Sequence, residues 1–212
     1  MSPPGRSRSP RGQGEQLREE ILEAAQSLLM ETASEDAVSI RAVADAVGVT
    51  PPSIYRHFAD KDRLLLEVCR LSFERFTDVL EDAFREDHDP RRRIEGMGRA
   101  YVRYAVDNPE HYRIMFMARF ELTTQEYAEE MVTDGSSFDL LLRTADELVT
   151  AGLVRPELAD RGALTIGMLF WANVHGLASL LVAKPGLPWP DRDRLIDDLV
   201  TAATRGILLD PR

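Results

Sequence analysis

Residues 39–58 read SIRAVADAVGVTPPSIYRHF, and their pattern is that of two short helices joined at a glycine. Ser39 is a residue type that caps helix N-termini, and apolar residues recur after it at i, i+3, i+4 and i+7, the spacing of one helix face. Gly48 then stands where a glycine ends a helix. The sequence therefore predicts a short amphipathic helix between Ser39 and Gly48.

A second short helix is predicted directly after this corner. Thr50 can cap it, and Pro51 suits its first position, where the missing N–H costs nothing. Ile54 and Phe58 face inward in this helix, which we expect to end near Ala59. Two short helices joined at a glycine, with a third packed upstream, have helix-turn-helix geometry, whose second helix enters the major groove of DNA.

The rest of the chain also predicts helices. A 3.6-residue period starts near Glu15, and no sustained period-2 alternation or fixed-length repeat occurs. The segment from Thr123 to Gly135 is ambiguous between helix and loop. The fold class is therefore all-α, with further helices expected over about 15–32, 60–86, beyond Pro90, beyond Pro109, from Phe138 to Gly152, and over about 160–183 and 191–209.

Three regions follow from this pattern. Residues 1–14 are rich in Ser, Pro, Gly and Arg and predict a disordered basic tail. Residues 15–60 form the expected DNA-binding domain, and residues 61–209 form a second helical domain. The predicted helix over 60–86 would span roughly 40 Å and could join the two.

Composition limits the function classes. The net charge is −10, so any contact with DNA must be local rather than a coating of nucleic acid by bulk charge. The single cysteine, Cys69, excludes an intrachain disulfide and a thiolate metal site. The longest apolar stretches, such as 163–171, are broken by Gly or polar residues well short of the roughly 18 apolar residues of a membrane span, and no secretory signal is recognisable. We expect a cytoplasmic protein with no membrane contact, metal or cofactor.

The residues of the second helix that we expect to face the groove are those other than Ile54 and Phe58, whose side chains face inward. Thr50 and Ser53 offer hydroxyl groups, and Pro51 offers an apolar surface for a thymine methyl group. Arg41 could reach a phosphate or a guanine. The predicted DNA-binding set is Arg41, Thr50, Pro51, Ser53, Tyr55, Arg56, His57 and Lys61, of which Tyr55, His57 and Lys61 are expected at phosphates.

The segment from Ser39 to Leu65 resembles the DNA-binding domain of TetR-type transcriptional regulators, most densely at GV (48–49), YRHF (55–58) and Lys61. The resemblance extends over about residues 15–73. It implies an all-α regulator that binds a palindromic operator as a homodimer, usually as a repressor that a small molecule releases. It also implies phosphate contacts for Tyr55 and Lys61. The pair Pro51-Pro52 departs from the single proline that is commoner at this place.

A second resemblance lies in the C-terminal half. The sequence WANVHGL (171–177), with NPEHY (108–112), is similar to the TetR subgroup whose C-terminal domain is named for its Trp, His and Gly. Trp171 and His175 share one helix face at i and i+4. His175 could serve either a ligand pocket or the packing of the core. The resemblance further implies that residues 61–209 form an effector-binding and dimerisation domain, which dimerises through the last two helices.

Candidate effector-binding residues combine apolar side chains with a few hydroxyl and imidazole groups, as in small-molecule pockets between helices. The same residues could instead be core, and a methionine-rich wall would suit apolar or aromatic effectors. The candidates are Met97, Tyr101, Tyr104, Tyr112, Met115, Phe116, Phe138, Leu141, Trp171 and His175.

Two other function classes remain as alternatives. An enzyme could use His111 or His175, but the histidines are isolated in sequence and no His-Glu-x-x-His motif or phosphate-binding glycine loop occurs. The sequence therefore predicts that the protein is not an enzyme. A helical small-molecule-binding protein or a structural helical bundle, neither with a DNA role, is the other alternative.

Overall fold

The computed structural model describes residues 13–32, 38–117 and 135–210. These residues are almost entirely helical, and extended pairing occurs among them only as an isolated antiparallel bridge between Val154 and Leu208. The all-α prediction is therefore confirmed. Most of the predicted basic tail (1–12) and nearly all of the ambiguous segment (residues 123–134) lie outside the described residues.

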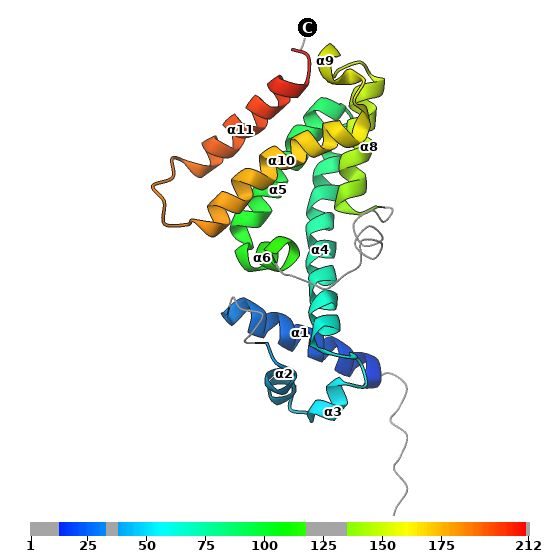
Figure 1. Ribbon diagram of the computed structural model, residues 1–212, viewed down its shortest axis with the longest axis vertical. Helices are drawn as coiled ribbons and strands as arrows, with labels where there is room; N and C mark the ends of the chain where they lie inside the picture. Colours follow the sequence, from blue (N-terminus) through cyan, green and yellow to red (C-terminus); the bar gives the residue numbers. More distant parts are fainter. Residues whose placement is uncertain (1–12, 33–37, 118–134, 211–212) are drawn as a thin grey trace, which may run out of the picture. The chain divides into compact units, whose positions relative to one another are not determined.

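The helices are labelled in Figure 1. In chain order they are α1 (Gln13–Thr32), α2 (Ile40–Val47), α3 (Pro51–Ile54), α4 (Lys61–Glu86), α5 (Pro90–Asp107), α6 (Pro109–Met117), α8 (Ser137–Thr150), α9 (Pro156–Ala159), α10 (Gly162–Ala183) and α11 (Arg192–Ile207).

The chain forms two compact units, which meet between Arg70 and Leu71, within α4. The sequence analysis placed the boundary earlier, between residues 60 and 61. The difference arises because the first turns of α4 pack in the first unit. Leu64 is fully buried there, and Glu67 Oε2 accepts a hydrogen bond of 2.8 Å from Arg18 Nη2 of α1.

The first unit has the predicted helix-turn-helix connection. Ser39 Oγ accepts a hydrogen bond of 3.1 Å from Ala42 N, and Gly48 ends α2 in the left-handed region with φ of 76°. The second helix is shorter than expected, since α3 ends at Ile54 rather than near Ala59. Phe58 N nevertheless donates to Ile54 O at 3.0 Å, so the turn after α3 still buries both side chains as predicted.

In the second unit, α10 packs against α5, α8 and α11 (Figure 1). The approach of α5 to its neighbours is close at Gly98, where a Cβ atom would lie 3.3 Å from Val200 and 3.4 Å from Val174. The short helix α9 was not predicted, and α10 begins at Gly162 rather than near Asp160. Gly162 has φ of 77°, which interrupts the helical run and separates the two helices.

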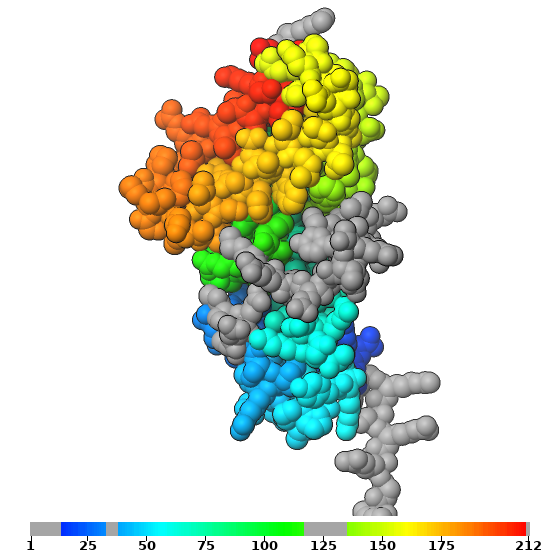
Figure 2. Space-filling view, viewed as in Figure 1, coloured from blue at the N-terminus to red at the C-terminus, as the bar shows by residue number. Residues whose placement is uncertain are grey.

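The helix α10 is buried on one side only. Its sequence is apolar nearly all round, yet Leu164, Met168 and Leu180 are 58%, 41% and 52% exposed. Figure 2 shows the side chains of α10, coloured yellow to orange, as an uncovered strip on the second unit. A single chain therefore leaves a substantial apolar face without a partner among the described residues.

By length and composition alone, α10 could cross a membrane, because its 18-residue window has a mean hydropathy of 1.6. The sequence analysis considered unbroken apolar runs and found none long enough, so this result corrects it. The evidence for a span is weak, because 44% of the window is buried and the core helix of a soluble protein passes the same test.

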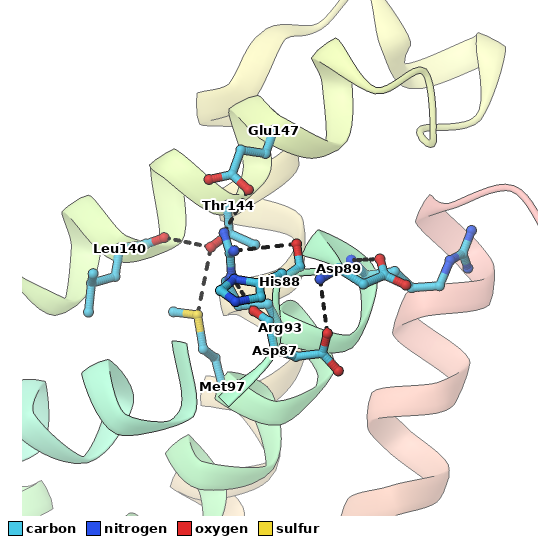
Figure 3. A network of polar contacts seen from close by, with 9 residues as sticks. Asp87, His88, Asp89, Arg93, Met97, Leu140, Thr144 and Glu147 are labelled. Atoms are coloured by element: carbon cyan, nitrogen blue, oxygen red, sulfur yellow. Dashed lines mark hydrogen bonds and ion pairs between the residues drawn. The ribbon is translucent and has the colours of Figure 1, made fainter. Parts of the chain in front are cut away.

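A buried arginine joins the start of α5 to α8 (Figure 3). The Arg93 side chain is only 8% exposed, and its Nη1 donates to Glu147 Oε2 at 2.6 Å. Its Nε donates to Asp87 O at 3.1 Å, and its guanidinium lies 4.3 Å from the centre of the Phe84 ring. These contacts satisfy a charge that would be costly to bury alone.

Candidate nucleic-acid interface and ligand cavity

The polar side of the helix-turn-helix is uncovered by the described part of the chain. Tyr55 is 55% exposed although its ring is large and mostly apolar, whereas Ile54 and Phe58 beside it are buried. Of the other predicted DNA-binding residues, Arg41, Thr50 and Arg56 are exposed, and Pro51, Ser53, His57 and Lys61 are half-buried. An aromatic hydroxyl and two guanidinium groups are thus available to a partner.

Thr50 stands at the N-cap of α3 but makes no capping hydrogen bond through its side chain. Pro51 and Pro52 have no N–H to offer, and the next amide, Ser53 N, donates to the backbone oxygen of Thr50 at 2.8 Å. The Thr50 hydroxyl instead lies 3.2 Å from the Ser53 hydroxyl. The predicted side-chain cap is therefore wrong, and the two hydroxyls form a pair at the start of α3.

Two of the predicted cationic residues stand at helix starts on either side of α3. Arg41 is in the first turn of α2, and Lys61 is the first residue of α4. The start of α4 is fixed by Asp60, whose Oδ1 accepts a hydrogen bond of 2.8 Å from Arg63 N. The helix caps thus fix where the backbone presents these cations.

The second unit contains a cavity of about 60 Å³ between α4, α5, α6, α8 and α10. A water molecule needs about 10–15 Å³ measured in this way, so the space admits only a few atoms until its walls move. Among the residues that the structure describes, none with an Asp, Glu, Lys, Arg or His side chain lines it. The lining residues are Phe73, Phe76, Leu80, Ile94, Met97, Gly98, Tyr101, Phe116, Ser137, Phe138, Leu141, Phe170, Trp171 and Val174.

The structure brings most of the predicted effector-binding residues to this cavity. Those on its wall are Met97, Tyr101, Phe116, Phe138, Leu141 and Trp171. Tyr112 and His175 do not line the cavity, but both contact Tyr101. Tyr104 and Met115 are buried but do not line the cavity, and the Tyr104 hydroxyl lies 3.3 Å from His111 Nδ1 instead.

Sequence reasoning missed the wall that α4 contributes. Phe73, Phe76 and Leu80 lie on the cavity, and Phe76 packs edge-on against Tyr101 with ring centres 5.1 Å apart. Their spacing of i, i+3 and i+7 is a detectable signal, because it places all three on one helix face. The sequence analysis named no residue of this helix among the effector-binding candidates.

A polar network adjoins the cavity. The hydroxyl oxygens of Tyr101 and Tyr112 lie 2.8 and 2.9 Å from the same atom, His175 Nδ1. Trp171 Nε1 donates to the Tyr101 hydroxyl at 3.2 Å, and the Tyr112 hydroxyl lies 2.9 Å from Ser179 Oγ. Residues of α5, α6 and α10 therefore meet in one hydrogen-bonded group.

Burial keeps this group uncharged. It raises the pKa of Tyr101, which the nearby Tyr112 hydroxyl raises further, and it also raises the pKa of Tyr112. It lowers the pKa of His175 below its ordinary value. At neutral pH the network thus consists of two protonated tyrosines and a neutral imidazole, which act as hydrogen-bond donors and acceptors rather than charges.

Two family models match the chain. One, described as "Bacterial regulatory proteins, tetR family", matches residues 21–68, and the other, "Tetracyclin repressor-like, C-terminal domain", matches residues 94–203, about half of the chain. The HTH-type transcriptional activator FasR from Mycolicibacterium smegmatis is 27% identical over 123 residues. This match covers 53% of the chain and 56% of FasR, so it spans only about half of that relative.

Solved structures show the same architecture. A protein of unknown function from Rhodococcus sp. RHA1 is 28% identical, with a TM-score of 0.75, over 95% of this chain and all of that one. A TetR family transcription regulator from Marinobacter aquaeolei VT8 is 19% identical and shares the fold, with a TM-score of 0.69 over 93% of this chain and 98% of that one. The chain therefore belongs to the TetR family, and it is a transcriptional regulator with a helix-turn-helix DNA-binding domain rather than an enzyme.

Proposed function

We propose that the protein is a repressor that binds a palindromic operator as a homodimer and is released by a small-molecule effector. The observation that carries this proposal is the uncovered polar side of the helix-turn-helix. Tyr55 and Arg56 are exposed on it while Ile54 is fully buried. A helix that buries one side and presents hydroxyl and guanidinium groups on the other can enter a major groove.

Each DNA-binding residue has a proposed role. Tyr55, His57 and Lys61 hold phosphates, which fixes the position of the protein without reading the sequence. Thr50 and Ser53 approach base edges with their paired hydroxyls, and Pro51 approaches a thymine methyl group. Arg56 and Arg41 supply the remaining contacts, Arg41 to a phosphate or a guanine. Because the net charge is −10, attraction to DNA depends on these few cations.

The proposed dimer interface is formed by α10 and α11 of each chain. The uncovered apolar side chains of α10 support it, since Leu164 and Leu180 are more than half exposed. Two copies that bury these faces against each other form a four-helix bundle with two-fold symmetry. Such a dimer would place its two copies of α3 about 34–36 Å apart, one turn of DNA.

The proposed effector is an uncharged apolar or aromatic molecule. The support is the lining of the cavity, where Met97, Phe116 and Phe138 stand among other uncharged residues. To release DNA, the effector must bind more tightly to a dimer whose two α3 helices do not fit the operator than to a dimer whose spacing fits it. We propose that α4, whose residues belong to both units, transmits this change.

Selection of DNA fragments from the host genome by the purified protein tests the proposal. We expect an enriched palindrome, bound by a dimer, upstream of genes whose transcription rises when the protein is removed. Because the relative FasR is named an activator, the sign of regulation is a separate readout. Failure to enrich any palindrome would favour a helical ligand-binding protein without a DNA role, and an unchanged Tyr55–Tyr55 distance with effector bound would contradict the release mechanism.

The protein is proposed to act in the cytoplasm, where its DNA target lies, without a membrane contact. The burial of nearly half of the apolar window of α10 supports this assignment. Fractionation of host cells is the measurement, and recovery of the protein with the membranes would contradict it.

A further inference from the structure

His175 Nδ1 has more hydrogen-bonding neighbours than one ring nitrogen can serve. Two tyrosine hydroxyls, those of Tyr101 and Tyr112, lie within 2.9 Å of the single atom Nδ1. A ring nitrogen in the plane of a neutral imidazole has one hydrogen-bonding position, as either an acceptor or a donor. Only one of the two hydroxyl groups can therefore make a full hydrogen bond with Nδ1 at a time.

The two tyrosines differ in their alternatives. The Tyr112 hydroxyl can donate to Ser179 Oγ at 2.9 Å or to the backbone oxygen of His175 at 3.3 Å. The Tyr101 hydroxyl accepts from Trp171 Nε1, which is a donor only, so its own proton needs an acceptor elsewhere. Among the described residues, the acceptors in its reach are His175 Nδ1, at 2.8 Å, and the Tyr112 hydroxyl. A neutral imidazole nitrogen is a stronger acceptor than a phenol oxygen, so without a ligand Tyr101 donates to His175, and Tyr112 donates to Ser179 or the carbonyl.

Tyr101 also lies on the wall of the apolar cavity, as does Trp171. If a ligand oxygen accepts the Tyr101 proton, Nδ1 becomes free, and Tyr112 can donate to it at its present distance of 2.9 Å. The exchange keeps Nδ1 and both tyrosine hydroxyls hydrogen-bonded, and an unpaired buried group among these three would otherwise cost affinity. A hydrocarbon offers no such acceptor, and a carboxylate would enter an apolar cavity whose lining, as far as the described residues form it, holds no cation.

We propose that Tyr101 is a specificity-determining residue that selects neutral, apolar effectors bearing a carbonyl oxygen, such as ketones or esters. His175 and Tyr112 act as positioning residues, since they take over the hydrogen bond that Tyr101 gives up. The inference rests on the proposed effector function of the same cavity, and it adds the chemical class of the effector.

The test uses the full chain and a matched pair of probes, 2-octanone and 2-methyl-1-octene, which differ in one oxygen against one methylene group. The chain has two tryptophans, so Trp189→Phe leaves Trp171 on the cavity wall as the fluorescent reporter. We expect the ketone to bind about five- to tenfold more tightly than the alkene. Tyr101→Phe should abolish this preference while leaving the affinity for the alkene within about twofold.

Two further variants separate recognition from packing. Tyr104→Phe removes a hydroxyl from the same helix at a position off the cavity, and it should keep the full ketone preference. Tyr112→Phe should reduce the preference for the ketone but not the affinity for the alkene, because Nδ1 then loses its replacement donor. If Tyr101→Phe does not fold, this second variant decides the question.

The outcomes distinguish the two proposals. Equal affinity of the unchanged Tyr101 protein for ketone and alkene would overturn the carbonyl selection but leave the cavity as an effector site. An equal loss of affinity for both probes in Tyr112→Phe would show a packing role only, which also overturns the inference. If neither probe binds, the cavity is not an effector site and both proposals fail.

Discussion

Arg93 Nη1 of α5 lies 2.6 Å from Glu147 Oε2 of α8, and the two residues are 54 positions apart in sequence. The arginine is buried, whereas the Glu147 side chain is 44% exposed. The guanidinium also holds the backbone oxygen of Asp87 and covers the ring of Phe84. The stability of the second unit therefore depends more on the arginine than on its acidic partner (Figure 3).

Substitutions of this pair should be unequal. We expect Arg93→Ala to lower the free energy of unfolding by about 2–3 kcal/mol, because it unpairs buried oxygens and removes packing on Phe84. Glu147→Gln should lower the free energy of unfolding by about 1 kcal/mol, since solvent already screens the carboxylate. Arg143→Ala is the control, as Arg143 also contacts Phe84 but is 55% exposed, and urea denaturation measures all three. Equal losses for Arg93 and Arg143 would contradict this account.

Tyr55→Phe should weaken DNA binding about fivefold for every sequence alike, because it removes one hydrogen bond to a phosphate. Titration of the variant against the selected operator and a scrambled duplex measures this. Because Tyr55 is exposed, the variant should fold as the unchanged protein does, and thermal unfolding serves as the check. A change in base preference would assign Tyr55 to a base edge instead.

Arg41→Ala distinguishes the two roles left open for this residue. If Arg41 reads a guanine, the variant should lose about 1–3 kcal/mol of discrimination at one operator position. If it binds a phosphate, affinity should fall uniformly and the salt dependence should flatten by about 0.9 in log–log slope. Selection from a random library at two salt concentrations gives both readouts, and wild-type behaviour in both would remove Arg41 from the interface.

Met168→Glu should split the proposed dimer, because it places a charge on the uncovered face of α10. Met30→Glu is a matched control, since Met30 on α1 has nearly the same exposure, 43% against 41% for Met168. Light scattering after size exclusion reports the mass, which for one chain is 23.9 kDa. We expect Met168→Glu to have the mass of one chain and Met30→Glu to have twice that mass. Two unchanged dimers would place the interface elsewhere.

Acidification should weaken the folded state through His175. Burial lowers the pKa of this residue in the folded chain, so the unfolded chain binds the proton first as pH falls through the ordinary value of 6.5. The free energy of unfolding should therefore decrease between about pH 7 and pH 5 and level off once the folded chain also binds the proton. His175→Gln should reduce this slope. An identical slope in the His175 variant would contradict the assignment.

Interactions between residues close in sequence determined the helices and the helix-turn-helix of the first unit. The hydroxyl of Ser39 and the positive φ of Gly48 act within a few residues of themselves, so the sequence contains all that is needed to place α2. The same holds for the cap at Asp60 and for the burial of Ile54 and Phe58, which one helical period specifies. The exception, the unused side chain of Thr50, depended on two adjacent prolines that remove the amides it would have capped.

Tertiary packing alone decided the sites of the second unit. Tyr101 and His175 are 74 positions apart, and Tyr112 and His175 are 63 apart, so no local period relates them. Which aromatic residues line a cavity and which fill the core depends on the angles at which helices cross, and those angles follow from the packing of whole helix faces. Sequence therefore supplied the residue types, while the crossing of α5, α6 and α10 brought two hydroxyls to one nitrogen.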